Sequence, residues 1–472
     1  MITELPARIH TDDVGVTYNM IFDTLVGNPP FHIKKVGNKK SQSVWDKFVR
    51  KNFELCVEGG YVALIHPSAW RDALGAFKSI NRLLTSKQLE YLELHDSADG
   101  QITFGVATTY DWYVAHNVEN TKKTKIKFQD GMIDDSDIKT EFIPNAKVDQ
   151  FRSIFAKNGE ESVEILYNCK YHHIYKHISN TKTKTHKWPC IYTIGKNDKI
   201  RLVWSSKNIG HFGIPKFIWT NGQYKSLGTL ADINGDYGMT EFAYGIVDTP
   251  ENVQKIKSVF DSDEFRSFMV CGSTNGYGFN RRVIAKFRKN WWKDFMSNNH
   301  RFSNNTTNCE SVIPPKSITK IHTKEAIASR GEVFTPAWLV KEMLDKLPQD
   351  ILADPVKTVL DNSCGNGNFL IEVLHRRLAA GIPHNEALST IYGVELDAPN
   401  AEECRVRLLL GSADQTLRSI VDHNIICADA LDPKHAGWDS VGFYWDDTDL
   451  KRRNKSRKHK HEVEEIWRNL GV

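Results

Sequence analysis

Apolar positions follow two different periods over the first part of the chain. Three runs have the length and apolar content of buried strands, at residues 19–27, 59–67 and 103–116. Between the first two runs, residues 44–57 place apolar side chains at helical spacing. Strands that alternate with helices are typical of a parallel or mostly parallel sheet covered by helices, so we predict an α/β fold. This region is too short to complete such a domain alone.

The last part of the chain repeats the pattern. A helix is predicted over residues 333–347, because Thr335 and Pro336 form a typical helix start. Residues 357–381 predict a strand, a glycine-bearing loop and a helix, and two further strands follow at 389–397 and 423–431. These strands are the ones that the first region lacks. We therefore expect one sheet built from both ends of the chain.

The middle of the chain is polar, aromatic and rich in turn residues, which predicts a separate domain of mixed structure. We expect four parts, namely residues 1–117 and 318–450 as two halves of one domain, 118–317 as an insertion and 451–472 as a basic tail. In the shared sheet, we expect residues 20–26 to pair in parallel with residues 424–428.

The composition indicates the cellular compartment of the protein but not its function. The formal net charge of +4 permits a polyanionic partner without requiring one. The 8 cysteines include no Cys-x-x-Cys pair, so they suggest neither a disulfide framework nor a cysteine zinc site, and a reducing cytoplasm is the expected compartment. No run of about 18 apolar residues occurs, so we expect no membrane segment.

The tetrapeptide Asn28-Pro29-Pro30-Phe31 directly follows the first predicted strand. Open α/β sheets bind ligands at the carboxyl ends of their strands. The two prolines fix the backbone and remove two N–H donors, which leaves the Asn28 side-chain oxygen and a backbone carbonyl to accept hydrogen bonds from an amino group. Phe31 offers a face on which a planar base can stack. A rigid turn without function is the alternative for an isolated Asn-Pro-Pro.

Three strands of the last part end in acidic residues, Asp361, Glu395 and Asp429. Asp361 suits a cationic group such as the amino group of a methionyl moiety. Glu395 stands where an acid commonly accepts hydrogen bonds from ribose hydroxyls, and Asp429 could accept one from an adenine amino group. Gly365 and Gly367 let the backbone approach a ligand, but their spacing is not that of a dinucleotide or phosphate loop.

With these residues, the chain resembles the amino-directed DNA methyltransferases over both end regions. Phe334-Thr335-Pro336 is similar to motif X of that family, the loop from Asp361 to Phe369 to motif I, and Asn28 to Phe31 to the catalytic motif IV. Glu395 and Asp429 match the acids of motifs II and III. Motif IV comes first and motifs X to III last, which is the circularly permuted order of the β class, whereas NPPF and FTP are typical of γ-class adenine enzymes.

The resemblance implies an α/β fold with a Rossmann-like, circularly permuted sheet that binds S-adenosylmethionine, and an inserted target-recognition domain. It implies that residues 1–117 form the catalytic half of the methyltransferase domain and residues 318–450 the cofactor-binding half. The implied catalytic residues are Asn28, Pro29, Pro30 and Phe31. The implied cofactor-binding residues are Phe334, Thr335, Pro336, Asp361, Cys364, Gly365, Gly367, Phe369, Glu395, Asp429 and Ala430.

The implied reaction is methyl transfer to the N6 amino group of adenine in double-stranded DNA, by a stand-alone enzyme or part of a restriction-modification system. The implied setting is the cytoplasm of a bacterial or phage-infected cell. An N4-cytosine methyltransferase, a protein-glutamine methyltransferase and a DNA-specificity subunit without turnover stay open as alternatives. A separate restriction endonuclease and a second copy of the chain stay open as partners.

The middle region adds candidate DNA contacts and two further motifs. Basic and aromatic residues gather at 182–188 and 281–292, which suits phosphate and base contacts. His173 and His177 have helical spacing but no third ligand in view, so we expect no metal. Pro189-Cys190 has the form of the nucleophile motif of carbon-5 cytosine methyltransferases, but nothing around it supports that role.

Overall fold

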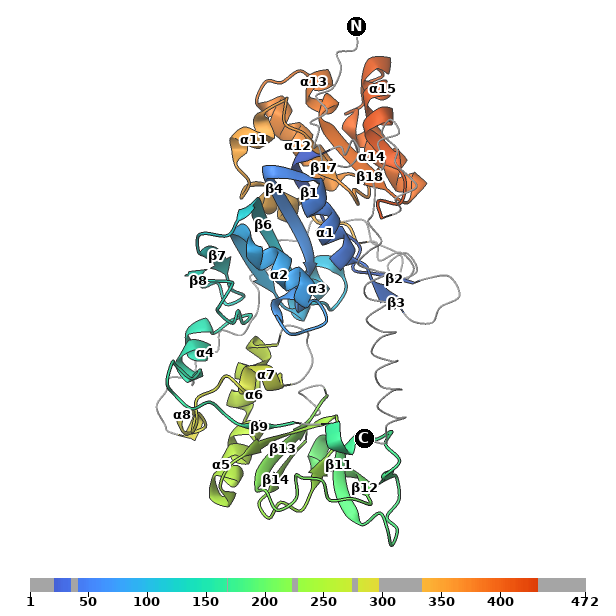
Figure 1. The fold of residues 1–472 in the computed structure, drawn as a ribbon. Coiled ribbons are helices and arrows are strands. Elements are labelled where there is room, and N and C mark those ends of the chain that lie inside the picture. Colours follow the sequence, from blue (N-terminus) through green and yellow to red (C-terminus); the bar gives the residue numbers. More distant parts are fainter. Residues whose placement is uncertain are drawn as a thin grey trace, which may run out of the picture. The chain divides into compact units, whose positions relative to one another are not determined.

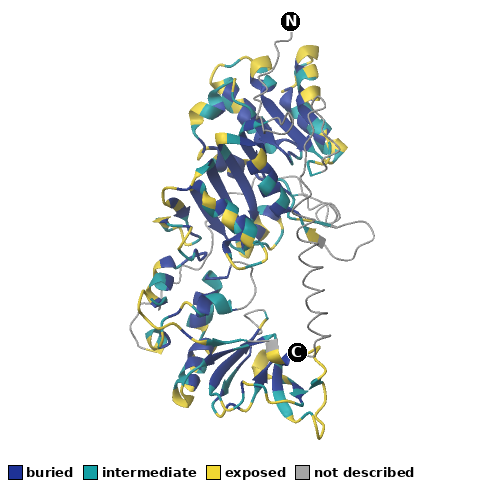
Figure 2. Cartoon of the chain, in the orientation of Figure 1, coloured by how far each residue is buried: buried dark blue, intermediate teal, exposed yellow. Residues whose placement is uncertain are grey.

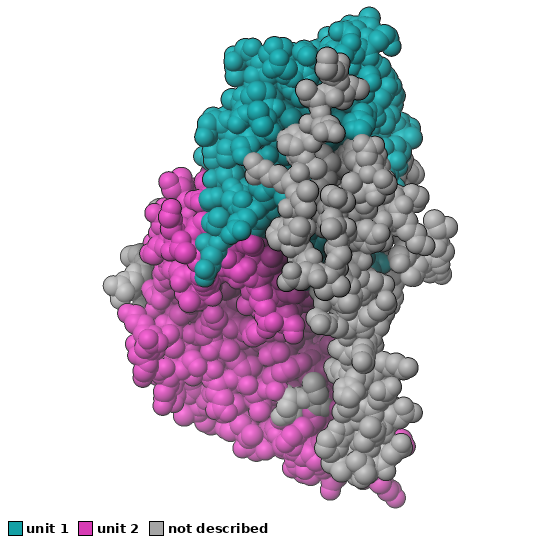
Figure 3. Space-filling model, turned by 45° about the horizontal axis from the view of Figure 1, so that its top comes forward, with its two compact units in different colours: residues 1–65, 114–119, 319–472 teal, residues 66–113, 120–318 magenta. Residues whose placement is uncertain are grey.

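The computed structural model describes residues 21–34, 41–167, 169–222, 228–273, 279–296 and 333–431. The chain forms two compact units (Figure 3): residues 1–65, 114–119 and 319–472 make the first, and residues 66–113 and 120–318 make the second. The predicted basic tail, residues 451–472, lies outside the described residues. Among the described residues, no helix is both long and apolar enough to cross a membrane.

The first unit holds a parallel sheet built from both ends of the chain (Figure 1). Its strands are β1 (Phe22–Gly27), β4 (Cys56–Pro67), β17 (Val359–Asp361), β18 (Ile391–Glu395) and β19 (Ile425–Cys427). They pair in the order β19-β18-β17-β1-β4, and each neighbouring pair is parallel. Residues from 114 onward of β6 (Tyr110–Glu119) belong to the same unit. The prediction of one sheet from both chain ends is therefore confirmed at the level of strand pairing.

The predicted pairing of residues 20–26 with residues 424–428 is wrong. Strand β1 pairs with β17 on one side and β4 on the other, so β17 and β18 lie between β1 and β19. Phe22, Leu25 and Val26 have no exposed surface, which is typical of a central strand whose two faces are both covered (Figure 2). Strand β19 is short and ends in an exposed residue, as edge strands commonly do.

Helices and a hairpin complete the first unit. The hairpin pairs β2 (His32–Lys34) with β3 (Ser41–Ser43) in antiparallel fashion. The helices are α1 (Trp45–Leu55), α10 (Ala337–Leu344), α11 (Gln349–Ala353), α12 (Asn368–Ala379), α13 (His384–Ser389), α14 (Ala398–Leu408) and α15 (Gln415–Asn424). Helix α14 begins after Asp397, whose carboxylate accepts a hydrogen bond from Asn400 N, and α15 begins after Asp414 in the same manner. These caps place each helix start at the carboxyl end of the preceding strand or turn.

The second unit combines three strands of one sheet with two four-stranded sheets. Strand β5 (Lys87–His95) pairs in parallel with β7 (Thr124–Lys127), which pairs antiparallel with β8 (Ile133–Ser136). The four-stranded sheets have the orders β10-β12-β11-β15 and β14-β13-β16-β9. Their strands are β9 (Ile165–Leu166), β10 (Ile178–Ser179), β11 (Trp188–Ile194), β12 (Ile200–Ser205), β13 (Lys216–Thr220), β14 (Thr229–Asp232), β15 (Gly238–Met239) and β16 (Ala243–Val247).

The helices of the second unit pack an aromatic core against these strands. They are α2 (Lys78–Ser86), α3 (Ser97–Phe104), α4 (Val148–Ile154), α5 (Pro250–Asp261), α6 (Asp263–Cys271), α7 (Arg281–Ile284) and α8 (Lys293–Met296), with 3-10 turns η1 (Ser68–Arg71), η2 (Cys169–Tyr171) and η3 (Lys196–Asp198). Phe217, Trp219, Phe260, Phe265 and Trp291 belong to one buried cluster. Large aromatic side chains of this kind bury much apolar area per residue and hold a mixed fold together.

A buried polar network joins residues 66–113 to the inserted segment. Arg71 Nε donates to Asp111 Oδ2 at 2.9 Å, and its Nη1 donates to the Ile143 carbonyl at 2.9 Å. Arg71 Nη2 also donates to Asn145 Oδ1. The second compact unit therefore contains residues 66–113 of the N-terminal region together with residues 120–318. The division into four functional parts stays a prediction.

Candidate functional site

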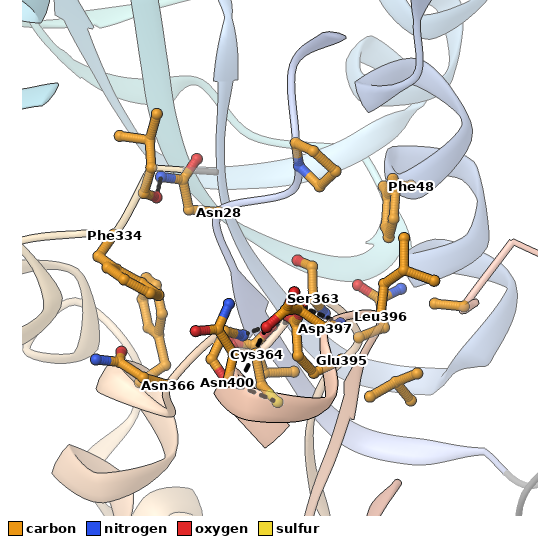
Figure 4. A pocket seen from close by; sticks show the side chains of 18 of the residues that line it. Asn28, Phe48, Phe334, Ser363, Cys364, Asn366, Glu395, Leu396, Asp397 and Asn400 are labelled. Atoms are coloured by element: carbon orange, nitrogen blue, oxygen red, sulfur yellow. Dashed lines mark hydrogen bonds between the residues drawn. The ribbon is translucent and has the colours of Figure 1, made fainter. Parts of the chain in front are cut away.

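A cavity of about 300 Å³ lies at the carboxyl ends of β1, β17, β18 and β19 in the first unit (Figure 4). It brings together predicted site residues from both ends of the chain, namely Asn28, Pro30, Phe334, Thr335, Asp361, Cys364, Gly365, Phe369, Glu395, Asp429 and Ala430. Four others, Pro29, Phe31, Pro336 and Gly367, are not part of its lining. Ligand pockets at this edge of a parallel sheet are the rule in open α/β folds.

Asn28 presents an unpartnered acceptor to this site. Its side-chain Nδ2 donates to the Val333 carbonyl at 3.3 Å, which fixes the plane of the amide. The other end of the amide, Oδ1, is buried and has no hydrogen-bond partner among the described residues. A buried acceptor without a donor costs about 1–3 kcal/mol, so such an atom is well suited to a ligand N–H.

Asp361 lies directly beside the loop that carries Asn28. A Cβ atom added to Gly27, which has φ +153°, would lie only 2.7 Å from Asp361 Oδ1, so glycine permits this approach. The Asp361 side chain accepts a hydrogen bond from Ser363 N at 3.0 Å. Burial, with a smaller contribution from the charge of Glu395, raises the pKa of Asp361 to about 8. A cationic ligand would favour the ionised form of this carboxyl group.

Glu395 fastens the backbone around the cavity. Its Oε2 accepts a hydrogen bond from Gly365 N at 2.8 Å, and its Oε1 accepts one from Asp397 N at 2.8 Å. The same carboxylate therefore positions the glycine loop after β17 and the turn after β18. A carboxylate oxygen can accept more than one hydrogen bond, which suits a ligand hydroxyl.

The glycine loop is close to residues that are far away in sequence. Gly365 has φ +53°, and a Cβ there would lie 2.8 Å from the Phe334 ring. Gly367 has φ +88° and is the N-cap residue just before α12, where a Cβ would lie 2.6 Å from Cys404 Sγ. Asn368 Nδ2 donates to the Thr335 carbonyl at 2.8 Å. These contacts hold the Phe334-Thr335 segment against the loop and explain why glycine is needed at both positions.

Three further predicted residues differ from one another in burial and contacts. Phe31 is half-buried beside the hairpin, and its carbonyl accepts from Val44 N at 3.2 Å. Asp429 is exposed, and its Oδ1 accepts from Leu431 N at 2.9 Å. The hydrogen bond with Cys404, together with burial, holds the pKa of the Cys364 thiol well above its usual range. A raised pKa keeps a thiol protonated and lowers its reactivity.

Several lining residues were missed from the sequence, among them Phe48, Val333, Asn366, Asp397 and Asn400. Asn366 and Asp397 stand inside or next to the quoted motifs, so their spacing was a usable signal. Phe48 had only its place on the apolar side of the predicted helix. Val333 contributes a backbone carbonyl, which no side-chain pattern can indicate.

The residues singled out in the middle region are found in the second unit. His173 and His177 lie in turns rather than on a helix, and His173 contacts Glu241. The Cys190 thiol is buried, and this burial raises its pKa to about 12. Basic groups lie over aromatic rings, with Lys182 Nζ 5.0 Å from the Trp204 ring centre and the Arg281 guanidinium 4.0 Å from that of Tyr167.

Both end regions match protein families. Residues 6–101, which include Asn28 to Phe31, match the family described as Eco57I restriction-modification methylase. Residues 317–441, which include Phe334 to Ala430, match the family described as N-6 DNA Methylase. No curated protein matches the chain.

Two solved structures similar to this chain come from restriction-modification systems. One is a chain of a type I system, with 19% identity, 22% of this chain and 23% of that chain covered, and a TM-score of 0.19. The other is the type IIL enzyme MmeI in complex with DNA, with 9% identity, 56% and 45% covered, and a TM-score of 0.30. The chain thus spans less than half the length of each of these two proteins. Structural similarity at these TM-scores carries no conclusion about the fold.

Proposed function

Because the two end regions of this chain match DNA methylase families, we propose that it transfers a methyl group from S-adenosylmethionine to the exocyclic amino nitrogen of adenine in double-stranded DNA. The observation that carries the proposal is the buried, unpartnered Asn28 Oδ1 beside the cavity that Asp361 and Glu395 also line. The proposed fold is a Rossmann-like methyltransferase sheet in circularly permuted order. Strand pairing between the two chain ends supports it.

The residues around the cavity fit the proposed cofactor. Bound S-adenosylmethionine supplies an electrophilic methyl group on a sulfonium centre. Asp361 would hold its cationic part, because the buried carboxyl group gains most from a neighbouring positive charge. Glu395 would hold the ribose hydroxyls, and Phe334 and Phe369 supply apolar surface for the adenosyl group.

Asn28 would select and orient the amino group of the target base. Its Oδ1 accepts one amino hydrogen, while the Nδ2 hydrogen bond to Val333 holds the amide so that the oxygen cannot turn away. The Pro29 carbonyl is the second proposed acceptor, and Pro29 and Pro30 bring no competing N–H donor. When the amino group donates its two hydrogens to Asn28 Oδ1 and the Pro29 carbonyl, the lone pair of its nitrogen is directed toward the methyl group. A positioned nitrogen of this kind would attack the methyl carbon directly while the bond from that carbon to sulfur breaks, and it would give up its extra proton to solvent afterwards, so no covalent nucleophile is required.

The target base must leave the duplex to reach such a cavity, at a cost of a few kcal/mol. We propose that the second unit offsets part of this cost through contacts of its basic and aromatic residues with the DNA backbone. Lys182, Lys187 and Arg281 lie over aromatic rings. Lysine and arginine contacts to phosphates position a protein on DNA without specifying sequence. A companion endonuclease and a second copy of the chain stay predictions.

N4-cytosine methylation is the closest alternative, because cytosine presents a similar amino group to the same acceptors. A protein glutamine side chain presents one too. The test is incubation of the purified chain with cofactor and genomic DNA from a strain without methylation, followed by mass spectrometry of the nucleosides. N6-methyladenine is the expected product. N4-methylcytosine, or methyl groups found in added protein and not in DNA, would replace the proposal by the corresponding alternative.

A further inference from the structure

Three side chains of types that can bind a metal ion meet in the second unit, whereas the cavity described above lies in the first. His172 and His173 follow η2, and Glu241 lies 68 residues after His173 in the turn between β15 and β16. Strand β15 belongs to one four-stranded sheet and β16 to the other. The cluster therefore lies where the chain crosses between the two sheets. We propose that His172, His173 and Glu241 bind a divalent transition-metal ion.

The geometry of the three donors suits a single ion. The ligand atoms of the three residues all lie within 4.8 Å of one another. His172 Nδ1 is 3.8 Å from Glu241 Oε1, and His173 Nδ1 contacts the same oxygen. Ligands at about 2.0–2.2 Å from a tetrahedral zinc ion are about 3.3 Å apart, so small side-chain rotations complete the site. Because His173 is exposed, solvent can reach the remaining coordination positions of the ion.

Two hydrogen bonds already orient the donors. The Ile174 backbone N–H donates to His172 Nδ1 at 3.4 Å, and an ion bound to this nitrogen would take the place of that long hydrogen bond. The His173 backbone N–H donates to Glu241 Oε2 at 3.1 Å, which leaves Oε1 directed at the two imidazoles. A cation between His172 Nδ1 and Glu241 Oε1 would attract both atoms.

The donor set also limits the kind of ion. Two imidazole nitrogens and one carboxylate oxygen suit Zn²⁺ and its first-row neighbours, whereas Mg²⁺ and Ca²⁺ prefer oxygen ligands. The His173 ring stacks on Phe242 with 5.8 Å between ring centres and meets the edge of Tyr192 at 5.8 Å. Such packing fixes the direction of the ring. The ion would hold the segment before β10 against the turn between β15 and β16. It would so stabilise the second unit against unfolding.

The test uses full-length protein without a histidine tag, dialysed against chelator and then titrated with ZnCl₂. Bound zinc is counted by elemental mass spectrometry and its affinity is measured by calorimetry, for wild type, Glu241→Gln and the His172→Ala/His173→Ala double variant. His177→Ala is the matched control, because His177 lies in the same segment and contacts the Lys170 carbonyl instead. Circular dichroism checks that each variant is folded.

We expect wild type and His177→Ala to bind one zinc ion per chain more tightly than both cluster variants, by at least about tenfold. Zinc should also raise the melting temperature of wild type and His177→Ala but not that of the cluster variants. The proposal is overturned if wild type binds no zinc. It is equally overturned if the Glu241→Gln and double variants keep wild-type affinity within tenfold, or if zinc shifts all four melting temperatures alike.

Discussion

The carboxyl group of Asp361 is buried at the end of β17 and has a pKa of about 8, so it is mostly protonated at neutral pH. A cation binds better to the ionised form, and binding must therefore release a proton below pH 8. We expect the affinity for S-adenosylmethionine to rise from pH 6 to pH 8, by up to about tenfold per unit, and then to level off. Calorimetry over this pH range measures it.

The control for this prediction is Asp361→Asn, which keeps the shape and removes the titration. Its affinity should be lower than that of wild type at pH 8 and should lack the wild-type rise. A wild-type affinity that falls with rising pH, or an unchanged pH profile in Asp361→Asn, would assign the proton to another group.

Some of the individual residues of this site can be predicted from the sequence. Asn28, Asp361 and Glu395 were predicted because each stands at the end of a predicted strand or directly after it, where parallel sheets expose their ligand-binding loops. The contact of Asn28 with the Val333 carbonyl was not, because backbone carbonyls have no residue signature. Glu241 was also missed as a partner of His173, since nothing in the local pattern links residues 68 positions apart.

At the scale of elements, the start of α12 depends on glycine at position 367. Gly367 and Gly381 stand at the two ends of this helix, with φ of +88° and +83°. A Cβ at Gly367 would lie 2.6 Å from Cys404 Sγ, whereas one at Gly381 meets nothing within 4 Å. Both alanine variants have the same backbone strain, about 1–2 kcal/mol, but only Gly367→Ala adds a clash.

We therefore expect Gly367→Ala to lower the free energy of unfolding by about 1–3 kcal/mol more than Gly381→Ala, and to weaken cofactor binding. Urea unfolding and calorimetry on both variants measure these effects. Equal losses of stability in the two variants would show that the loop does not pack on Cys404 as described.

Element types were easier to predict than element neighbours. The apolar runs indicated β1, β17, β18 and β19, and the structure has all four. The partner of β1 was wrongly predicted because an apolar run shows that both faces are covered and not which strand lies alongside. Length gave no signal either, because β17 and β19 both have 3 residues and only β17 pairs with β1.

At the scale of the whole molecule, Arg71 links residues 66–113 to the insertion, and the buried carboxylate of Asp111 holds the Arg71 side chain in place. The two side chains are 2% and 0% exposed, and Arg71 also donates to Ile143 and Asn145. Asp111→Ala leaves a buried guanidinium without its carboxylate, which costs about 3–5 kcal/mol. The matched control is Asp149→Ala, because Asp149 pairs with Arg152 while being 71% exposed. Exposed pairs contribute about 0–1 kcal/mol.

Denaturant unfolding of both aspartate variants checks this prediction. A loss in Asp111→Ala no larger than that in Asp149→Ala would contradict the role given to the buried pair. The sequence indicated an inserted domain at residues 118–317, but it had no signal for this link. Arg71 and Asp111 are 40 residues apart and lie outside the predicted insertion.

The central claim is that the two ends of the chain form one methyl-transfer site, with Asn28 acting on the target base and Asp361 and Glu395 holding the cofactor. The most direct measurement compares turnover and cofactor affinity in one preparation of Asn28→Ala. We predict that methyl transfer to DNA falls by more than tenfold, a loss above about 1.4 kcal/mol, while cofactor affinity stays within a few-fold of wild type. An Asn28→Ala enzyme that keeps more than a tenth of wild-type turnover would contradict the claim.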